Sequence, residues 1–444
     1  MASSTAWHNF PARQQPQYAD SAALEKVITE IHNLPPLVPQ AEIDELTSLI
    51  AASGRGEVFL LQGGDCAETF VDSSPARIRA KLQTLQQMAL VLNIGTSLPV
   101  VKVGRIAGQY AKPRSLPTEI QDGIELPSYR GDAVNGFAFT RASRSFDPER
   151  LLEAYRHAAK TLHFIHNFAA EPLPDWHYSF LPTSNSAIDP LYSRYQYLMA
   201  EIAEYLRQNP EKSQFSPPES NFYSAHEALL LRYEEALTRC GVKKDRLYNF
   251  GAHFLWIGER TRDINEAHVE MLSHISNPIG VKIGPKAQVE EVLALIEKLN
   301  PQNQPGRLSL IMRLGAKKIS ALLPPLIEAV QREGKVVTWI SDPMHGNTIS
   351  ACNGYKTRRM QDIWEELYRF FQIHFQLGTV PGGIHIELTS DDVTEVLGGA
   401  EKIDEDILAT RYEALVDPRL NRRQSLETAF RVAEIFREFA QPNN

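Results

Sequence analysis

The stretch Leu60-Leu61-Gln62-Gly63-Gly64-Asp65-Cys66-Ala67-Glu68 places an apolar run, a double-glycine turn and a thiol within nine residues. Glycine adopts positive φ at low cost and allows close backbone approach, so Gly63-Gly64 is typical of a strand end. A helical pattern follows at 75–93. This order favours a strand that presents Cys66 at its carboxyl end. A lone cysteine is more often a small buried apolar residue than a ligand, so a functional role for Cys66 requires partners elsewhere.

Strand-like and helical segments alternate downstream of Glu57, which is typical of a parallel sheet with crossover helices. The patterns predict strands at 57–62, 99–106, 246–254, 279–283, 308–313, 336–341, 383–388 and 414–417. They predict helices at 76–92, 148–169, 262–275, 286–299, 317–333, 362–376, 389–397 and 422–440. Eight such strands predict an α/β fold of the closed (β/α)8, or TIM, barrel type.

The connection between the second and third predicted strands, about 140 residues, is far longer than a barrel needs. Apolar stripes at helical spacing in 188–208 and 225–239 predict an inserted helical pair, joined by a loop rich in Pro, Ser and Asn. We therefore expect a helical extension at 1–56 and a barrel domain at 57–444, with inserted regulatory or interface helices at about 186–240. Core packing remains the alternative role for these stripes.

Composition narrows the class of protein. The 444 residues carry a net charge of −8 and only three cysteines, which argues against a general nucleic-acid surface and against a disulfide scaffold. No apolar run approaches the roughly 18 residues of a membrane span, and 1–20 lack a secretory apolar core. We expect a cytoplasmic protein with neither a membrane nor a nucleic-acid partner.

Metal-ligand residue types follow four of the predicted strands. Cys66 follows the first, His345 the sixth, Glu387 ends the seventh and Asp417 the eighth. In a parallel barrel the active site lies at the strands' carboxyl ends, so these side chains should meet. Sulfur, imidazole and carboxylate ligands together suit Mn, Fe, Co or Zn better than Mg or Ca. Each residue taken singly has an alternative interpretation. His345 would be a loop histidine whose hydrogen bonds are satisfied within the protein, and Glu387 and Asp417 would be solvated or ion-paired carboxylates.

Cations lie at the other strand ends. Arg105 follows the second predicted strand, Glu259-Arg260 the third, Lys282 lies in the fourth and Arg313 ends the fifth. A cation inside a barrel is costly to desolvate without an anion. Internal ion pairs with Glu259 or Asp342 could account for one or two of these cations, whereas phosphate and carboxylate binding would account for all four.

A second cationic motif, Lys112-Pro113-Arg114-Ser115, sets two cations and a hydroxyl around a proline of fixed φ. Such a motif is suited to binding a phosphate group, although cations are equally common in solvent-exposed loops. Two anion sites beside a metal imply two anionic substrates, or one with two acidic ends. His226-Glu227 begins like a zinc-protease HExxH motif, but Leu230 stands where its second histidine belongs.

These motifs together resemble the type II (plant-like) 3-deoxy-D-arabino-heptulosonate-7-phosphate (DAHP) synthases, over essentially 57–440. The resemblance rests on Gln62–Glu68, Lys102–Arg105, Lys112–Ser115, Trp256–Arg262, Val281–Pro285, Asp342–Thr348, Gly382–Glu387 and Asp417–Asn421. The family opens the shikimate pathway, in which aromatic amino acids are made, by condensing phosphoenolpyruvate with erythrose 4-phosphate.

The resemblance implies a role for each candidate residue. The implied metal ligands are Cys66, His345, Glu387 and Asp417, with Mn²⁺ or Co²⁺ expected and Zn²⁺ or Fe²⁺ as alternatives. The implied phosphoenolpyruvate site comprises Arg105, Glu259, Arg260, Lys282 and Arg313. The implied erythrose 4-phosphate site comprises Lys112, Arg114 and Ser115. For catalysis we expect Lys282 or His345 to protonate the nascent alkoxide and Glu259 to position a water.

The family also implies feedback inhibition by aromatic amino acids through the inserted helices, with tryptophan favoured. A homo-oligomer, dimer or tetramer, and a chorismate mutase partner are further implications. A related metal-dependent 3-deoxy-ulosonate phosphate synthase, or aldolase, is the alternative enzyme, but it should lack the Lys112–Ser115 motif. A catalytically silent regulatory homologue should have lost one of the four ligands.

Overall fold

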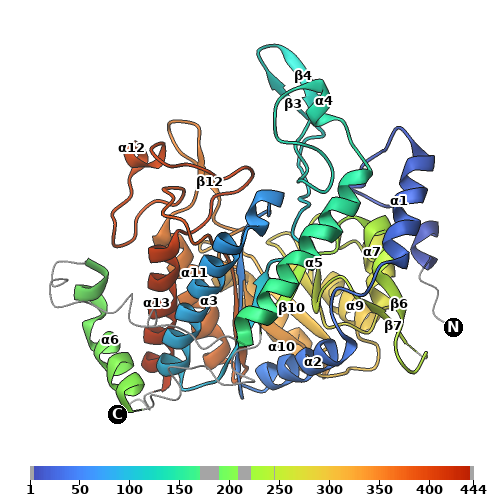
Figure 1. Ribbon diagram of the computed structural model, residues 1–444. Coiled ribbons are helices and arrows are strands. Elements are labelled where there is room, and N and C mark those ends of the chain that lie inside the picture. Colours follow the sequence, from blue (N-terminus) through green and yellow to red (C-terminus); the bar gives the residue numbers. More distant parts are fainter. Residues whose placement is uncertain (1–4, 171–189, 209–221, 245, 441–444) are drawn as a thin grey trace.

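The computed structural model describes residues 5–170, 190–208, 222–244 and 246–440. Its centre is a closed barrel of eight parallel strands ringed by helices, which confirms the predicted fold class (Figure 1). In chain order the barrel strands are β1 (Phe59–Gly64), β2 (Val100–Arg105), β5 (Phe222–Glu227), β8 (Phe254–Ile257), β9 (Ile279–Ile283), β10 (Leu308–Met312), β11 (Thr338–Ser341) and β14 (Pro381–Glu387). Each pairs with its predecessor and successor, and β14 closes onto β1.

The third and eighth predicted strands are wrong. The segment 246–254 contains β7 (Leu247–Asn249), which pairs with β6 (Thr238–Cys240) outside the barrel, and only the first residue of β8, the fourth barrel strand. The third barrel strand is β5. No strand lies at 414–417, because β14 already completes the barrel. Short apolar runs suit a strand or a helix equally, and only pairing decides between them.

The inserted helical pair is correct in its first member alone. Between β2 and β5 lie α5 (Glu149–Ala170) and α6 (Pro190–Gln208), and α6 packs on the barrel's outer helices through stacking of Tyr195 on Phe430. The second expected helix, 225–239, instead holds the end of β5, the short α7 (Leu231–Leu237) and the start of β6. Residues 186–189 and 209–221 of the expected insertion lie outside the described residues.

The barrel's outer helices largely match the prediction. They are α3 (Pro75–Thr96), α8 (Ala267–Ser273), α9 (Val289–Leu299), α10 (Ile319–Arg332), α11 (Met360–Gln376) and α13 (Arg422–Ala440). The predicted helix at 389–397 is wrong, because tertiary hydrogen bonds replace helical ones there: Leu397 N donates to Arg358 O, and Thr389 N donates to Leu420 O. No helix among the described residues is long and apolar enough to cross a membrane.

Short elements decorate the ends of the barrel. They are η1 (Ala6–Asn9), η2 (Phe70–Ser73), the hairpin of β3 (Thr118–Gln121) and β4 (Ile124–Pro127), α4 (Arg141–Arg144), β12 (Ile349–Ser350), β13 (Lys356–Thr357) and α12 (Glu405–Leu408). The β3–β4 hairpin projects from the side of the barrel opposite α2 (Gln40–Gly54), the second N-terminal helix (Figure 1). The first, α1 (Ser21–Asn33), packs against α5 and α7.

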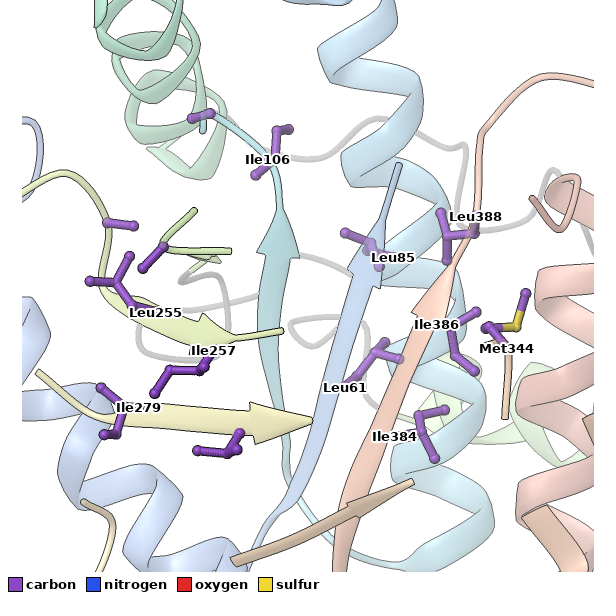
Figure 2. Packing of buried hydrophobic residues seen from close by; sticks show 14 of the residues in the cluster. Leu61, Leu85, Ile106, Leu255, Ile257, Ile279, Met344, Ile384, Ile386 and Leu388 are labelled. Carbon is purple, nitrogen blue, oxygen red and sulfur yellow. The ribbon is translucent and has the colours of Figure 1, made fainter. Parts of the chain in front are cut away.

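Two apolar clusters stabilise the barrel. Alternate side chains along each strand face inward or outward. Outward-facing residues such as Leu61, Ile384 and Ile386 join the shell that includes Leu85 of α3 (Figure 2). Inward-facing Leu60 belongs to an inner cluster, to which α2 adds Leu46 and Ile50. The helix α2 therefore closes the amino end of the barrel, which leaves the carboxyl end for a site.

Candidate active site

Strand register brings the first predicted site residues together. Gly64 of β1 pairs with Arg105 of β2 on one side and with Glu387 of β14 on the other. Gly64 has φ of +146°, and a Cβ there would lie 2.5 Å from the carbonyl oxygen of Arg105. Only glycine fits this close approach, so the double-glycine turn both ends β1 and delivers Cys66 beside Arg105 and Glu387.

The four predicted metal ligands converge. One donor atom each of Cys66, Glu387 and Asp417 lie within 4.8 Å of one another. His345 reaches the same group, because its Nε2 lies 3.0 Å from Glu387 Oε1. The imidazole is oriented by Asp342, whose Oδ2 lies 2.7 Å from His345 Nδ1. When Nδ1 donates to Asp342, Nε2 faces a carboxylate oxygen with its lone pair, and only a proton or a metal ion between them makes that contact favourable.

A cation already occupies the centre of this cluster. Lys112 Nζ lies 2.9 Å from Cys66 Sγ, 3.0 Å from Glu387 Oε1 and 3.2 Å from Asp417 Oδ2. This ammonium is a stand-in for a metal ion, since three donors from three separate segments surround one positive charge. The geometry and the mixed donor chemistry therefore fit a divalent transition metal.

The protonation of the cluster reflects burial and charge. Burial, helped by Glu387, raises the pKa of the Cys66 thiol to about 12. Although burial opposes ionisation, His345 and Lys112 hold the pKa of Glu387 well below its usual range. Lys112 likewise lowers the pKa of Asp417 against the effect of burial. The carboxylates are thus ionised, whereas the thiol stays protonated even beside the Lys112 ammonium and would ionise on binding a metal ion.

All five predicted phosphoenolpyruvate residues line one cavity of about 480 Å³, which we name the cationic cavity. Its wall carries seven cations, Arg105, Lys112, Arg260, Lys282, Lys286, Arg313 and Lys356, and three carboxylates, Glu227, Glu259 and Asp417. Trp256 lies beneath Arg105, with the guanidinium carbon 5.1 Å from the ring centroid. A cavity with this excess of positive charge is suited to a small multivalent anion.

Lys282 lines this cavity and lies close to three polar side chains. Its Nζ donates to Asp342 Oδ2 at 2.6 Å and lies 3.0 Å from His385 Nε2 and 3.3 Å from His345 Nδ1. Burial lowers the pKa of Lys282 to about 8, although Asp342 opposes the shift. Lys282 can therefore give up or take up a proton close to neutral pH.

The predicted sugar-phosphate residues are only partly brought together. Lys112 lines the cationic cavity, whereas Arg114 and Ser115 do not. Ser115 Oγ accepts a hydrogen bond from Arg260 at 2.8 Å, so it adjoins that cavity. Arg114 pairs with Glu119 at 2.8 Å. Gln14 of the N-terminal segment holds the Lys112–Ser115 loop by two hydrogen bonds. Its Oε1 accepts from Arg114 N, and its Nε2 donates to Arg114 O.

The two glutamates of the cavity differ in their partners. Both Glu259 oxygens are engaged: Oε2 accepts from Gly284 N at 2.6 Å and from Arg262, and Oε1 accepts from Arg262 at 3.2 Å. Glu227 Oε1, by contrast, is buried without a hydrogen-bond partner among the described residues. Burial raises the pKa of Glu227, against the effect of Lys112 and Lys282. A buried carboxylate oxygen of this kind is available to a substrate or a water.

Sequence reasoning missed Glu227, His385 and Arg358. Glu227 was missed because β5 was not recognised, although a charged residue ends that strand, as Arg105 ends the neighbouring β2. His385 lies two residues before Glu387 and points to the same side of β14, and its Nδ1 lies 2.7 Å from Gln62 Oε1. Burial lowers the pKa of His385 well below its usual range, so its neutral ring can accept hydrogen bonds from Lys282 and Arg105. Arg358 donates to Glu387 Oε2 at 2.8 Å.

Comparison with known proteins agrees with this geometry. Residues 2–433 match the model of the class-II DAHP synthetase family. A phospho-2-dehydro-3-deoxyheptonate aldolase of Streptomyces coelicolor is 50% identical over 442 residues, covering 97% of each chain. One of Mycolicibacterium smegmatis is 46% identical over 441 residues, covering 96% of this chain and 93% of its own. One of Neurospora crassa is 44% identical over 457 residues, covering 97% and 94%.

Proposed function

The chain belongs to the class-II DAHP synthetase family, and from this premise we propose that it is a DAHP synthase. This transferase condenses phosphoenolpyruvate with D-erythrose 4-phosphate and water, and releases phosphate. The observation that carries the proposal is a single cavity in which seven cations adjoin a cluster of thiol, imidazole and carboxylate donors. Two phosphorylated substrates, one of them an aldehyde that must be polarised, suit this combination.

The cations divide between the two substrates. Arg105, Arg260, Lys282 and Arg313, together with the backbone around Glu259, bind phosphoenolpyruvate. Lys112, Arg114 and Ser115 bind erythrose 4-phosphate. The hydrogen bond from Arg260 to Ser115 supports adjacent sites, because it joins the two groups directly. Adjacent sites hold the reacting carbons together, which converts a bimolecular step into an effectively unimolecular one.

A divalent metal belongs to this site. Cys66, His345, Glu387 and Asp417 would hold it, and their donor set favours Mn²⁺ or Co²⁺, with Zn²⁺ or Fe²⁺ as alternatives. When bound, the metal would act as a Lewis acid on the aldehyde. Arg358 and Asp342 would keep Glu387 and His345 oriented, as outer hydrogen-bond partners of metal ligands do.

Carbon–carbon bond formation requires a proton donor. The C2–C3 π electrons of the enol attack the aldehyde carbon, and the carbonyl oxygen becomes an alkoxide that takes a proton. Lys282 is the donor that the site favours, because its pKa of about 8 leaves the ammonium largely protonated near neutral pH. His345 is the rival donor, but its two ring nitrogens face Asp342 and Glu387.

Hydration of C2 completes the reaction. A water adds to the electrophilic C2 and loses a proton, and the resulting hemiketal phosphate breaks its C2–O bond to release phosphate. We assign the proton acceptor to Glu227 rather than to Glu259, because Gly284 and Arg262 engage Glu259, whereas Glu227 Oε1 has no hydrogen-bond partner in the described part of the chain. Glu259 then supports the phosphoenolpyruvate site by holding Gly284 and Arg262 in place.

Membership of this family leads us to propose further properties. The product would enter the shikimate pathway, and an aromatic amino acid, tryptophan in the first place, would inhibit the enzyme. The helix α6, which is the first member of the expected helical pair, is the described segment that would contribute to the effector site. A homo-oligomer and a chorismate mutase partner belong to the same set of expectations.

The test is a direct assay of the chelated protein supplemented with Mn²⁺ or Co²⁺. Loss of the phosphoenolpyruvate absorbance and release of phosphate should require erythrose 4-phosphate, and arabinose 5-phosphate should not replace it. Turnover with arabinose 5-phosphate alone would favour the related 3-deoxy-ulosonate phosphate synthase. Absence of turnover with any divalent metal would favour a catalytically silent homologue.

A further inference from the structure

A second cavity reaches the donor cluster from a different set of segments. It measures about 220 Å³ and is lined by parts of 66–77 and 413–419 together with Asp391. It shares Asp417 with the cationic cavity, and it also contacts Cys66, which the cationic cavity does not. Two of the four donors therefore face a space that none of the proposed substrate-binding residues lines.

The two cavities carry opposite charge. The second cavity has four carboxylates, Asp72, Asp391, Glu413 and Asp417, against two guanidinium groups, those of Arg77 and Arg419. We name it the acidic cavity. The cationic cavity has seven cations against three carboxylates. Because both end on the same donor cluster, they offer an approaching ion two routes of opposite potential.

The cations of the acidic cavity are already paired. Arg77 donates to Asp72 at 2.7 Å, and Arg419 lies 2.9 Å from Asp65 and 2.7 Å from Glu395. The Glu413 carboxylate pairs at 2.9 Å with Arg411, which does not line the cavity. Asp391 makes a long 3.4 Å contact with the hydroxyl of Thr389. Apart from the donor Asp417, Asp391 and Glu413 are thus the lining carboxylates for which the structure shows no ion pair with a lining guanidinium among the described residues.

We propose that the acidic cavity is the route by which the divalent metal reaches Cys66 and Asp417, separate from the cationic cavity through which the anionic substrates enter. A dication is attracted by carboxylate-lined walls and repelled by seven cations, and such local potentials change association rates strongly. The separation would let metal exchange continue while substrates fill the cationic cavity. This inference rests on the proposed metal centre.

The test measures how fast Co²⁺ binds to chelated, full-length protein. Stopped-flow absorbance of the Co²⁺–thiolate chromophore at low ionic strength gives the association rate constant and reports an intact site through its spectrum. The variant Asp391→Asn/Glu413→Gln should lower the association rate about three- to tenfold, with the Co²⁺ spectrum unchanged. Saturating phosphoenolpyruvate should leave the wild-type rate within about twofold.

A matched control removes one charge from the other cavity. Lys286→Gln at the exposed rim of the cationic cavity should leave the Co²⁺ association rate within about twofold of wild type. A wild-type rate in the double variant, or a rate that saturating phosphoenolpyruvate abolishes, would overturn the acidic route. If the double variant loses the Co²⁺ spectrum, the association rate is measured in the single variant Asp391→Asn instead. A wild-type rate in that variant would overturn the acidic route, and a lowered rate would support it. Failure of the wild-type protein to give any Co²⁺–thiolate spectrum would instead reject the metal centre.

Discussion

At the scale of single residues, the site depends on which polar groups are already satisfied. Glu227 and Glu259 line the same cavity, yet Glu259 is held by Arg262 and Gly284 while Glu227 retains a free buried oxygen. The same reasoning applies to Lys112, whose ammonium lies among the predicted ligands rather than beside Arg114 and Ser115. Chemical type predicted that Glu259 and Lys112 matter, whereas contacts in the structure identify Glu227 and separate the roles of all three.

Replacing Glu227 tests the assignment of the water-activating carboxylate. Glu227→Gln keeps the shape of the side chain beside Gly258 but removes the base, so kcat should fall about 10²- to 10³-fold with a small change in KM for phosphoenolpyruvate. Glu259→Gln should mainly raise KM for phosphoenolpyruvate, because Glu259 supports the phosphoenolpyruvate site by holding Gly284 and Arg262 in place. Steady-state kinetics on both variants checks this. The reverse pattern would return the role to Glu259.

Replacing Cys66 tests the metal centre. Cys66→Ser substitutes a harder, weaker ligand for the thiolate and should lower Co²⁺ or Mn²⁺ affinity at least about tenfold in equilibrium dialysis. Cys352→Ser is the matched control, since Cys352 is exposed and forms no part of the donor cluster. Equal metal affinity in the two variants would remove Cys66 from the metal site.

At the scale of elements, loops and short strands are where sequence and structure diverge. The segment Phe222–Glu227 is a barrel strand, but its helical-looking neighbours with Leu229, Leu230 and Tyr233 predict a helix that starts too early. The segment 414–417 looks like a strand but forms part of the wall of the acidic cavity. Long outer helices such as α11 and α13 were predicted well, because their apolar faces recur over many turns.

Replacing Gln14 tests whether the N-terminal segment, which lies outside the barrel, supports the Lys112–Ser115 loop. Gln14 makes two hydrogen bonds to the backbone of Arg114, at 3.0 and 3.1 Å. Each such bond contributes about 1 kcal/mol, so Gln14→Ala should raise KM for erythrose 4-phosphate by up to about tenfold as the Lys112–Ser115 loop loosens. KM for phosphoenolpyruvate should change little. Equal increases in both KM values would show a general disturbance rather than a role in this loop.

At the scale of the whole molecule, charge is segregated within an acidic protein. The net charge of −8 coexists with a cavity that holds seven cations, because the carboxyl ends of five strands, β2, β8, β9, β10 and β11, bring these cations to the same end of the barrel. The other end is closed by α2, whose Leu46 and Ile50 complete the inner cluster. The cationic cavity and the apolar closure thus lie at opposite ends of the barrel.

Buried histidines make the whole fold sensitive to acid. Burial lowers the pKa of His374 to about 3 and that of His268 to about 4, from 6.5 in the unfolded chain. Below pH 6.5 the unfolded chain binds protons that the folded chain does not, so stability falls as pH decreases toward these values. The loss is about 1.4 kcal/mol per pH unit for each histidine.

His374→Gln should therefore lessen the fall in stability between pH 6.5 and 5 by about 2 kcal/mol, as measured by urea unfolding at both pH values. His32→Gln, which alters an exposed histidine, is the control and should leave the pH dependence unchanged. An unchanged pH dependence in His374→Gln would mean that His374 is protonated in the folded protein or becomes so without penalty.

The sequence by itself predicted the barrel class, the family, the four donors and five of the seven cations of the cationic cavity, all but Lys286 and Lys356, because strand periodicity, motifs and residue type are local properties. Even the opening Gly63-Gly64-Asp65-Cys66 stretch was placed correctly at a strand's carboxyl end. Only the tertiary structure decided which segment is the third strand, that Lys112 sits among the donors, and that Glu227 is free where Glu259 is engaged. Those outcomes depend on contacts across tens to hundreds of residues, as between Cys66 and Asp417, and barrel closure rather than local pattern sets them.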